Sequence, residues 1–187
     1  MANKDSAFGL RPIGKVGQNR DNQGLSEYDI AASASAIYKN DPVEMAATGT
    51  ITVAAATDTL LGSLTGVFFT DASTSKPTFA NHLKGSNTAT DIKGFVADDP
   101  YERFEIQSDD ATAAADVGLN ADIVYASGAS PNFVSKVELD HSDLKTATAQ
   151  LRVLAISKDI ENNEAGSANV NLVVMINEHF LKGTTGI

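Results

Sequence analysis

Short apolar runs separated by turn-forming residues are the feature that most limits how this chain can fold. From Leu25 onward, runs rich in Val, Ile, Phe and Tyr alternate with Gly, Pro, Asn, Asp and Ser. This rhythm is typical of strands joined by turns, whereas an amphipathic helix needs apolar residues three and four positions apart. The expected strands are 25–30, 36–45 with a turn at Asn40-Asp41-Pro42, 50–54, 66–70, 92–97, 102–107, 123–126, 132–139, 149–156 and 169–179.

Two of these runs also predict which faces are buried. Phe104 and Ile106 alternate with polar residues, so they share one face of a strand over 102–107. In 169–179 apolar residues occupy both faces, which favours a central strand or one in a subunit interface. Helical signals are few: 109–118 fits either a short capped helix or a loop, and 140–144 fits a single turn.

Residues 1–24 differ from the rest of the chain. They contain four glycines and a run of Asn and Gln but no strand or helix periodicity, so we expect an extended N-terminal arm. Its main apolar residues are Phe8, Leu10, Ile13 and Val16. In a free tail these side chains would be exposed to water, which indicates that the arm contacts another surface. We therefore predict a single mainly β domain, sandwich-like or barrel-like, over 25–187, with an arm over 1–24 that contacts a partner or a neighbouring subunit.

Charge and composition exclude several classes of protein. The formal net charge is −10, and a negative chain is repelled by nucleic acid and by anionic lipid. The arm alone is mildly basic, which is compatible with an acidic protein surface as its partner. Zero cysteines exclude disulfides, thiolate zinc sites and cysteine nucleophiles. We expect no secretory signal and no membrane span, since no stretch approaches 18 apolar residues.

The sequence contains few motifs of catalytic or ligand-binding sites. The Gly-rich nucleotide loops and the Gly-x-Ser-x-Gly elbow are absent, and Gly14-Lys15-Val16-Gly17 lacks the strand and helix that a phosphate loop needs. None of the three histidines has a metal-ligand spacing. The pairs Asp98-Asp99 and Asp109-Asp110 are the first candidates for a structural ion, although the calcium-loop spacing is missing. We expect no cofactor, and we keep a hydrolase using Asp98, Asp99 and His82 as a remote alternative.

Four segments resemble a known family. They are the opening MANKDSAFGLRPIGKVG, Asp99-Pro100-Tyr101-Glu102-Arg103-Phe104-Glu105-Ile106-Gln107, Thr148-Ala149-Gln150-Leu151-Arg152-Val153-Leu154 and Met175-Ile176-Asn177-Glu178-His179. In order and position they resemble small virion structural proteins of tailed bacteriophages, namely capsid decoration or cement proteins. The segments lie in the arm, the middle and the end, so the resemblance covers nearly the whole chain.

The resemblance implies a protein that binds the outside of the major capsid shell, commonly as a homotrimer, and locks neighbouring capsomers together. Within the arm, Phe8, Leu10, Arg11 and Ile13 are the candidate partner-binding residues. If the arm contacts the capsid, deleting residues 1–20 should leave a folded body that no longer binds capsids. A minor head or tail-tube protein and a carbohydrate-binding β module are the alternatives.

Overall fold

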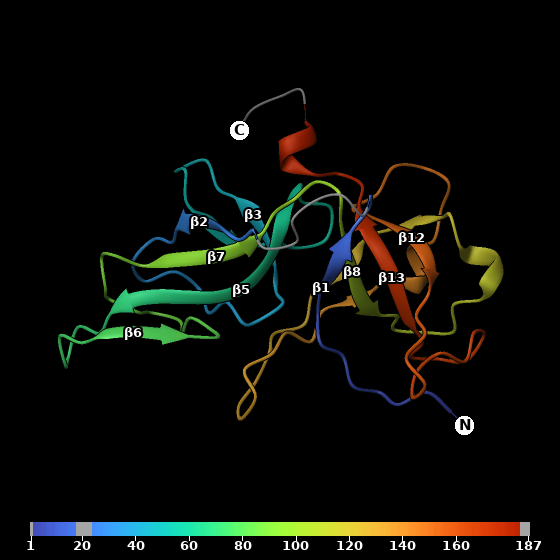
Figure 1. Cartoon of the computed structure of the whole chain (residues 1–187), viewed down its shortest axis with the longest axis horizontal. Helices are drawn as coiled ribbons and strands as arrows, with labels where there is room; N and C mark the ends of the chain where they lie inside the picture. The colour runs from blue at the N-terminus through green and yellow to red at the C-terminus, as the bar shows by residue number, and fades with distance from the viewer. Residues whose placement is uncertain (1, 18–23, 184–187) are drawn as a thin grey trace.

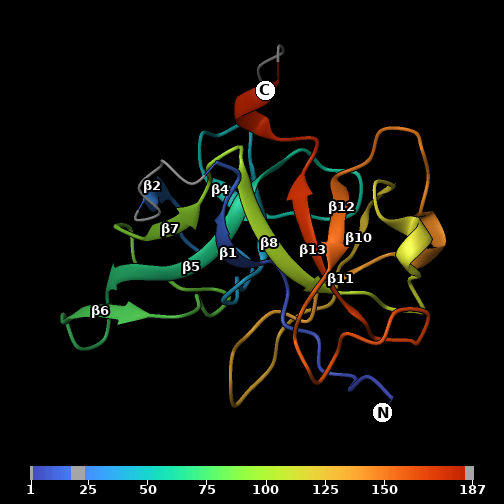
Figure 2. The same cartoon turned by 45° about the vertical axis from the view of Figure 1, so that its right-hand side comes forward.

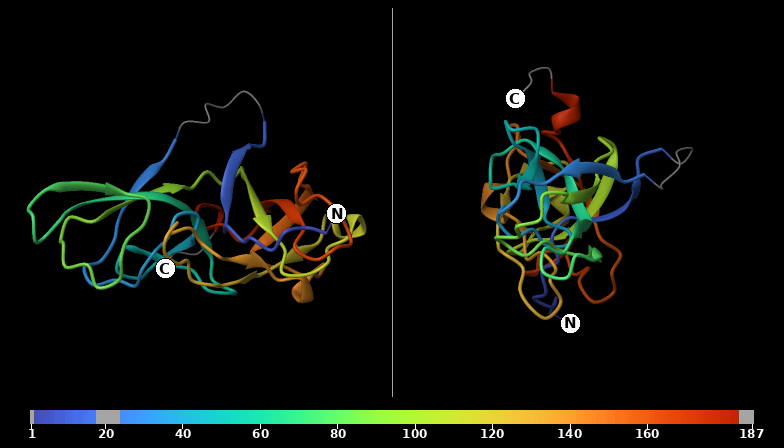
Figure 3. Two further views of the ribbon diagram at one scale, coloured as in Figure 1. Left: turned by 90° about the horizontal axis from the view of Figure 1, so that it is seen from below. Right: turned by 90° about the vertical axis from the view of Figure 1, so that its left-hand side faces the viewer.

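The computed structural model describes residues 2–17 and 24–183 (Figure 1). The expectation of a mainly β chain is confirmed: strands form two antiparallel sheets and one two-stranded ribbon. The two sheets follow one another along the long axis of the molecule (Figures 1 and 3). Each sheet has its own cluster of buried apolar side chains.

The first sheet contains the N-terminal and C-terminal strands. Its strands lie in the order β1 (Arg11–Lys15), β8 (Glu102–Gln107), β13 (Asn171–Ile176), β12 (Leu151–Ile156) and β9 (Asn120–Ala121). The strand expected to be central, β13, lies between β8 and β12 (Figure 2). Phe104, Ile106, Leu172 and Val174 point to the same face and are 0–1% exposed, which confirms the predicted alternation.

The second sheet is built around the long strand β5. Its strands lie in the order β2 (Ser26–Asp29), β7 (Lys93–Ala97), β5 (Leu60–Thr70), β3 (Pro42–Met45) and β4 (Ile51–Val53), and β6 (Pro77–Ala80) also pairs with β5. Ile51, Leu61, Leu64 and Val96 are fully or almost fully buried beneath it.

Short elements complete the fold. They are the ribbon of β10 (Ile123–Val124) and β11 (Glu138–Leu139), and three single-turn 3₁₀ helices, η1 (Ala114–Asp116), η2 (His141–Asp143) and η3 (Phe180–Lys182). The turn expected at 140–144 is confirmed as η2. Of the two alternatives at 109–118, the structure shows a loop, in which only the three residues of η1 are helical.

The N-terminal residues 2–17 lie on the body rather than apart from it. β1 pairs antiparallel with β8 at the edge of the first sheet, with a bulge between Pro12 and Gly14. Ahead of β1, Asn3 donates to the carbonyls of Glu164 and Ala168, both at 3.0 Å. The expectation of no strand in the arm is therefore wrong for Arg11–Lys15, and residues 18–23 of the expected arm lie outside the described residues.

Gly9 lets the chain enter the interior ahead of β1. It has φ +73°, and a Cβ there would lie 2.4 Å from both the carbonyl oxygen of Asn40 and the Cβ of Ser135. Only glycine fits such a close approach at a positive φ. The next residue, Leu10, is thereby placed in the core.

Three expectations about strands need correction. β5 begins at Leu60, six residues before the expected start, because its first half is buried on both faces and shows no alternation. The run 132–139 is a strand only at Glu138–Leu139, since Phe133 has φ +52°, which extended strands do not allow. β6 and β9 were not expected, because they are short and lack an alternating pattern.

Candidate interaction surfaces

The four arm residues predicted to bind a partner have different environments. Phe8 is half-buried, and the Arg11 guanidinium lies 4.5 Å above its ring. Arg11 also forms an ion pair with Glu105 of β8. Ile13 is 46% exposed. These three side chains remain accessible at the surface.

Leu10 does not fit the role expected for it. Its side chain is fully buried in the core of the first sheet. Its backbone is held as well: the N–H donates to the carbonyl of Asn40 at 2.9 Å, and the carbonyl accepts from Ser63 Oγ at 2.5 Å. We correct the expectation accordingly, because a side chain enclosed by its own chain has no surface left for a partner.

Ile13 and Leu25 form an exposed apolar pair that we call the arm patch. Their side chains are 46% and 53% exposed. Ile13 and Leu25 line one shallow hollow together with Ala97 and Glu102, at the place where the edge of the first sheet faces the second. Clustered exposed apolar side chains are typical of protein-binding surfaces.

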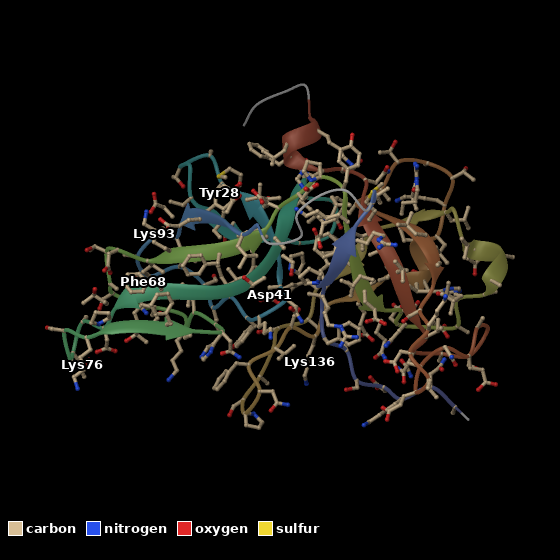
Figure 4. The ribbon with its side chains drawn as sticks, in the orientation of Figure 1. Tyr28, Asp41, Phe68, Lys76, Lys93 and Lys136 are labelled. Carbon is tan, nitrogen blue, oxygen red and sulfur yellow. The ribbon has the colours of Figure 1, made fainter. Side chains whose placement is uncertain are left out.

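A second exposed group, the aromatic patch, lies on the outer face of the second sheet. Phe68 of β5 pairs in register with Phe79 of β6, and their ring centroids are 4.8 Å apart. Phe95 of β7 stacks on Phe79 at 6.3 Å, and Phe79 is 74% exposed. Figure 4 shows Phe68 on the half of the second sheet that is remote from the first sheet. The sequence predicts the strands of Phe68 and Phe95 but not β6, which brings Phe79 into contact with both rings.

The residues considered for hydrolysis have separate partners. Asp98 accepts hydrogen bonds from Ser26 Oγ at 2.9 Å and Tyr28 Oη at 2.6 Å, and Asp99 pairs with Lys15 at 3.0 Å. His82 instead stacks on Phe133, with ring centroids 4.0 Å apart. Burial, and then the hydrogen bond to Asp98, raise the pKa of Tyr28 to about 12.

The two aspartate pairs considered for an ion lie at opposite ends of β8, since Asp99 precedes the strand and Asp109 follows it. Asp109 accepts from the backbone N–H of His141 and Asp110 from that of Ala111, so both stabilise turns. Among residues 2–17 and 24–183, no group of three or more His, Asp or Glu side chains is arranged to hold a metal ion.

Among the described residues, Asp41 and His179 are the ionisable side chains with the lowest exposure. Asp41 is 0% exposed, and Figure 4 shows it near the middle of the molecule. Burial raises the pKa of Asp41 to about 6, although its Oδ2 accepts from the Tyr38 N–H at 2.7 Å. His179, just after β13, is 2% exposed, and burial together with nearby Lys182 lowers its pKa to about 4. Asp41 accepts its hydrogen bond in the turn before β3, and His179 Nδ1 accepts one from the Leu181 N–H at the start of η3.

Comparison of the chain with protein-family models, curated sequences and solved structures finds no match. In the part of the chain that the structure describes, no helix has the length and apolar character needed to cross a membrane.

Proposed function

We propose that this chain is a bacteriophage capsid decoration protein that binds the outer surface of the major capsid shell as a homotrimer. The observation that carries the proposal is the presence of two exposed apolar patches on separate parts of one small body. The arm patch lies at the edge of the first sheet, and the aromatic patch lies on the far half of the second. A protein that bridges neighbours needs two contact surfaces, and the resemblance of the four sequence segments supplies the identity of the neighbour.

In this proposal the arm contacts the shell through Phe8, Arg11 and Ile13. Because residues 2–17 are already hydrogen-bonded to the body, binding does not require the ordering of a free tail. A surface that is ordered beforehand loses less conformational entropy on binding, so more of the contact energy appears as affinity. Three arms in one trimer multiply a weak contact through avidity.

Co-sedimentation with empty shells of the same virus tests the proposal. We expect the wild-type protein to pellet with shells, and Ile13→Ser with Leu25→Ser to reduce binding about tenfold or more, because each buried aliphatic side chain contributes about 1.5–3 kcal/mol. The matched control is Val117→Ser with Val124→Ser, which changes two side chains that are 41% and 37% exposed outside the patch.

The proposal fails if the wild-type protein stays in the supernatant at every shell concentration. Assembly of the isolated protein into tubes or rings would instead favour the tail-tube alternative.

A further inference from the structure

All three arginines in the described part of the chain lie on one face of the first sheet. The sequence has four arginines, and Arg20 is outside the described residues. Arg103 of β8 is opposite Met175 of β13, and Met175 is opposite Arg152 of β12, so the three side chains share a face. Arg11 reaches this face from β1, since it pairs with Glu105, two residues from Arg103. We call the solvent-facing surface formed by Arg11, Arg103, Met175 and Arg152 the arginine face.

The arginines of this face differ in their partners. Arg11 is paired with Glu105, the acidic side chain on this face, and Glu105 also accepts from Ser157 Oγ. Arg152 Nε donates to the amide oxygen of Asn120 at 3.1 Å. Arg103 Nε is buried and has no hydrogen-bond partner among the described residues. The carboxylate of Glu105 is therefore already occupied, whereas Arg103 retains a donor without an acceptor.

A groove of about 450 Å³ crosses this face beside Arg103. It lies between β1 and β12, with strands β8 and β13 as its floor. The lining combines apolar side chains with two cations and one carboxylate: Ile13, Leu154, Ile156, Val173, Arg103, Lys158 and Glu105. Such a groove suits an extended segment that carries both apolar side chains and carboxylates.

The charge of the groove is opposite to that of the whole chain. The formal net charge of the protein is −10, yet the groove itself is lined by Arg103 and Lys158 against one carboxylate, that of Glu105. Arg152 lies beside it on the same face, one strand pair away through Met175. Arginine and methionine are both enriched at the centres of protein interfaces, where lysine and acidic residues are depleted. The planar guanidinium also matches the two oxygens of a carboxylate.

We propose that this groove binds an extended acidic segment of a partner protein. Carboxylates of the segment accept hydrogen bonds from Arg103 and Arg152, and its apolar side chains pack on Val173, Met175 and Leu154. A protein segment fits better than nucleic acid, because the floor is apolar and the rest of the chain repels a phosphate backbone. The identification of the partner as the capsid shell rests on the proposed function, whereas the groove and its ligand chemistry do not.

A synthetic peptide provides the first test. The probe is fluorescein-labelled Glu-Glu-Leu-Glu-Glu-Glu-Leu, which in an extended conformation places Glu and Leu alternately on one face. The controls are the same peptide with Gln or Lys in place of every Glu. We expect saturable binding of the acidic peptide below about 1 mM in fluorescence anisotropy. We expect affinity to fall with rising salt, since carboxylate–guanidinium attraction is screened.

Variants then locate the binding site. Arg103→Gln and Arg152→Gln should each weaken peptide binding at least tenfold. The affinity of Arg103→Lys should lie between those of wild type and Arg103→Gln, because lysine keeps the positive charge but cannot donate two parallel hydrogen bonds to one carboxylate. Lys76→Gln with Lys84→Gln removes two exposed positive charges on the second sheet side and should leave binding unchanged. Arg152 is exposed, so Arg152→Gln keeps the test valid if Arg103→Gln does not fold.

The proposal is overturned if the Glu and Gln peptides bind equally, if the arginine variants bind like wild type, or if a 12-base-pair DNA duplex binds more tightly than the peptide. It is also overturned if the arginine variants lose self-association, because the occupant would then be a second copy. Shell binding is read separately. Peptide binding without shell binding overturns the proposed function and leaves the groove standing. Shell binding that the arginine variants do not change overturns the shell as the partner of the groove.

Discussion

Leu10 is enclosed by side chains of the first sheet while its backbone is bonded to residues of the second. It therefore joins the two halves of the molecule. We expect Leu10→Ala to lower the free energy of unfolding by about 2–5 kcal/mol, the usual cost of a large-to-small change in a core. Urea denaturation followed by circular dichroism measures this change.

The matched control for Leu10 is Val16→Ala, which shortens a side chain that is 48% exposed. It should change the free energy of unfolding by no more than about 0.5 kcal/mol. Equal midpoints for Leu10→Ala and wild type would show that Leu10 is not a core residue.

Asp41 gives the stability a pH dependence of unusual sign. Its pKa rises from 3.8 to about 6 on folding, so the folded chain keeps this proton longer than the unfolded chain does. The contribution of Asp41 to stability is thus complete below pH 4 and is lost as the pH rises through 6, by about 3 kcal/mol at most. We expect Asp41→Asn to gain stability relative to wild type between pH 4 and pH 7 in urea titrations. A difference between the two proteins that stays constant with pH would contradict this expectation.

His179 acts in the opposite direction. Its pKa falls from 6.5 to about 4 on folding, so its contribution is present above pH 6.5 and is lost as the pH falls toward 4. The loss of unfolding free energy in His179→Gln relative to wild type should therefore be smallest near pH 4 and largest above pH 6.5 in urea titrations. In the wild-type protein, the effects of Asp41 and His179 on the free energy of unfolding have opposite pH dependence between pH 4 and pH 6.5 and offset one another. The pH dependence of each group is therefore measured in the variant that lacks the other.

At the level of elements, β1 changes what truncation of the arm should do. From the sequence, removal of residues 1–20 was expected to leave a folded body. The structure predicts otherwise, because that deletion removes β1 and exposes the core that Leu10 covers. We expect the chain lacking residues 1–17 to be digested rapidly by a protease and to lose its cooperative thermal transition.

The control for the truncation is a chain lacking only residues 1–7, which keeps Gly9, Leu10 and β1. It loses the hydrogen bonds of Asn3, Lys4 and Ser6 to the body but keeps the buried side chain. This shorter deletion should remain cooperative with a lower midpoint. If both truncated chains melt like wild type, β1 does not belong to the stable fold.

Strands with a clear local pattern were predicted well, and strands held mainly by pairing with distant segments were not. β8 was predicted with its bounds because Phe104 and Ile106 alternate with polar residues. β1 has no such pattern, since it contains Pro12 and Gly14 and is held by pairing with a strand about 90 residues later in the chain. Long-range pairing leaves no signal in a local window, so the sequence predicts an extended arm that contacts a partner or a neighbouring subunit rather than the body of its own chain.

Long-range strand pairing also explains why the arginine face and the aromatic patch could be predicted only in part from the sequence. Alternation in β8 already placed Arg103 and Glu105 on the polar face, and the arm was already suspected of contacting a partner. The gathering of Arg11, Arg103 and Arg152 depends on the register of four strands, which the sequence does not specify. The aromatic patch depends in the same way on the pairing of β6 with β5.

At the level of the whole molecule, the aromatic patch offers an apolar surface on which copies of this acidic chain can associate. Lys93 beside it pairs with Asp29 at 2.7 Å and Glu27 at 3.4 Å, which offsets one of the two negative charges there. We expect Phe79→Ser to shift the protein from trimer toward monomer in size-exclusion chromatography with light scattering. The unfolding free energy of the monomer should change little, since Phe79 is 74% exposed.

Val117→Ser is the control for self-association and should elute like wild type. A wild-type protein that is monomeric at all concentrations would exclude the trimer, and a Phe79→Ser variant that stays trimeric would exclude the aromatic patch as the contact between copies.

The closure of the arm has a consequence for how the protein is made. Asn3 is bonded to Glu164 and Ala168, and Leu10 packs in the same core as Val174 and Ile176. During translation the first residues leave the ribosome long before these partners exist. The beginning of the chain must therefore wait until β13 has been synthesised, and a product interrupted earlier stays open to proteases. Only a chain translated through β13 can bury Leu10 against Val174 and Ile176.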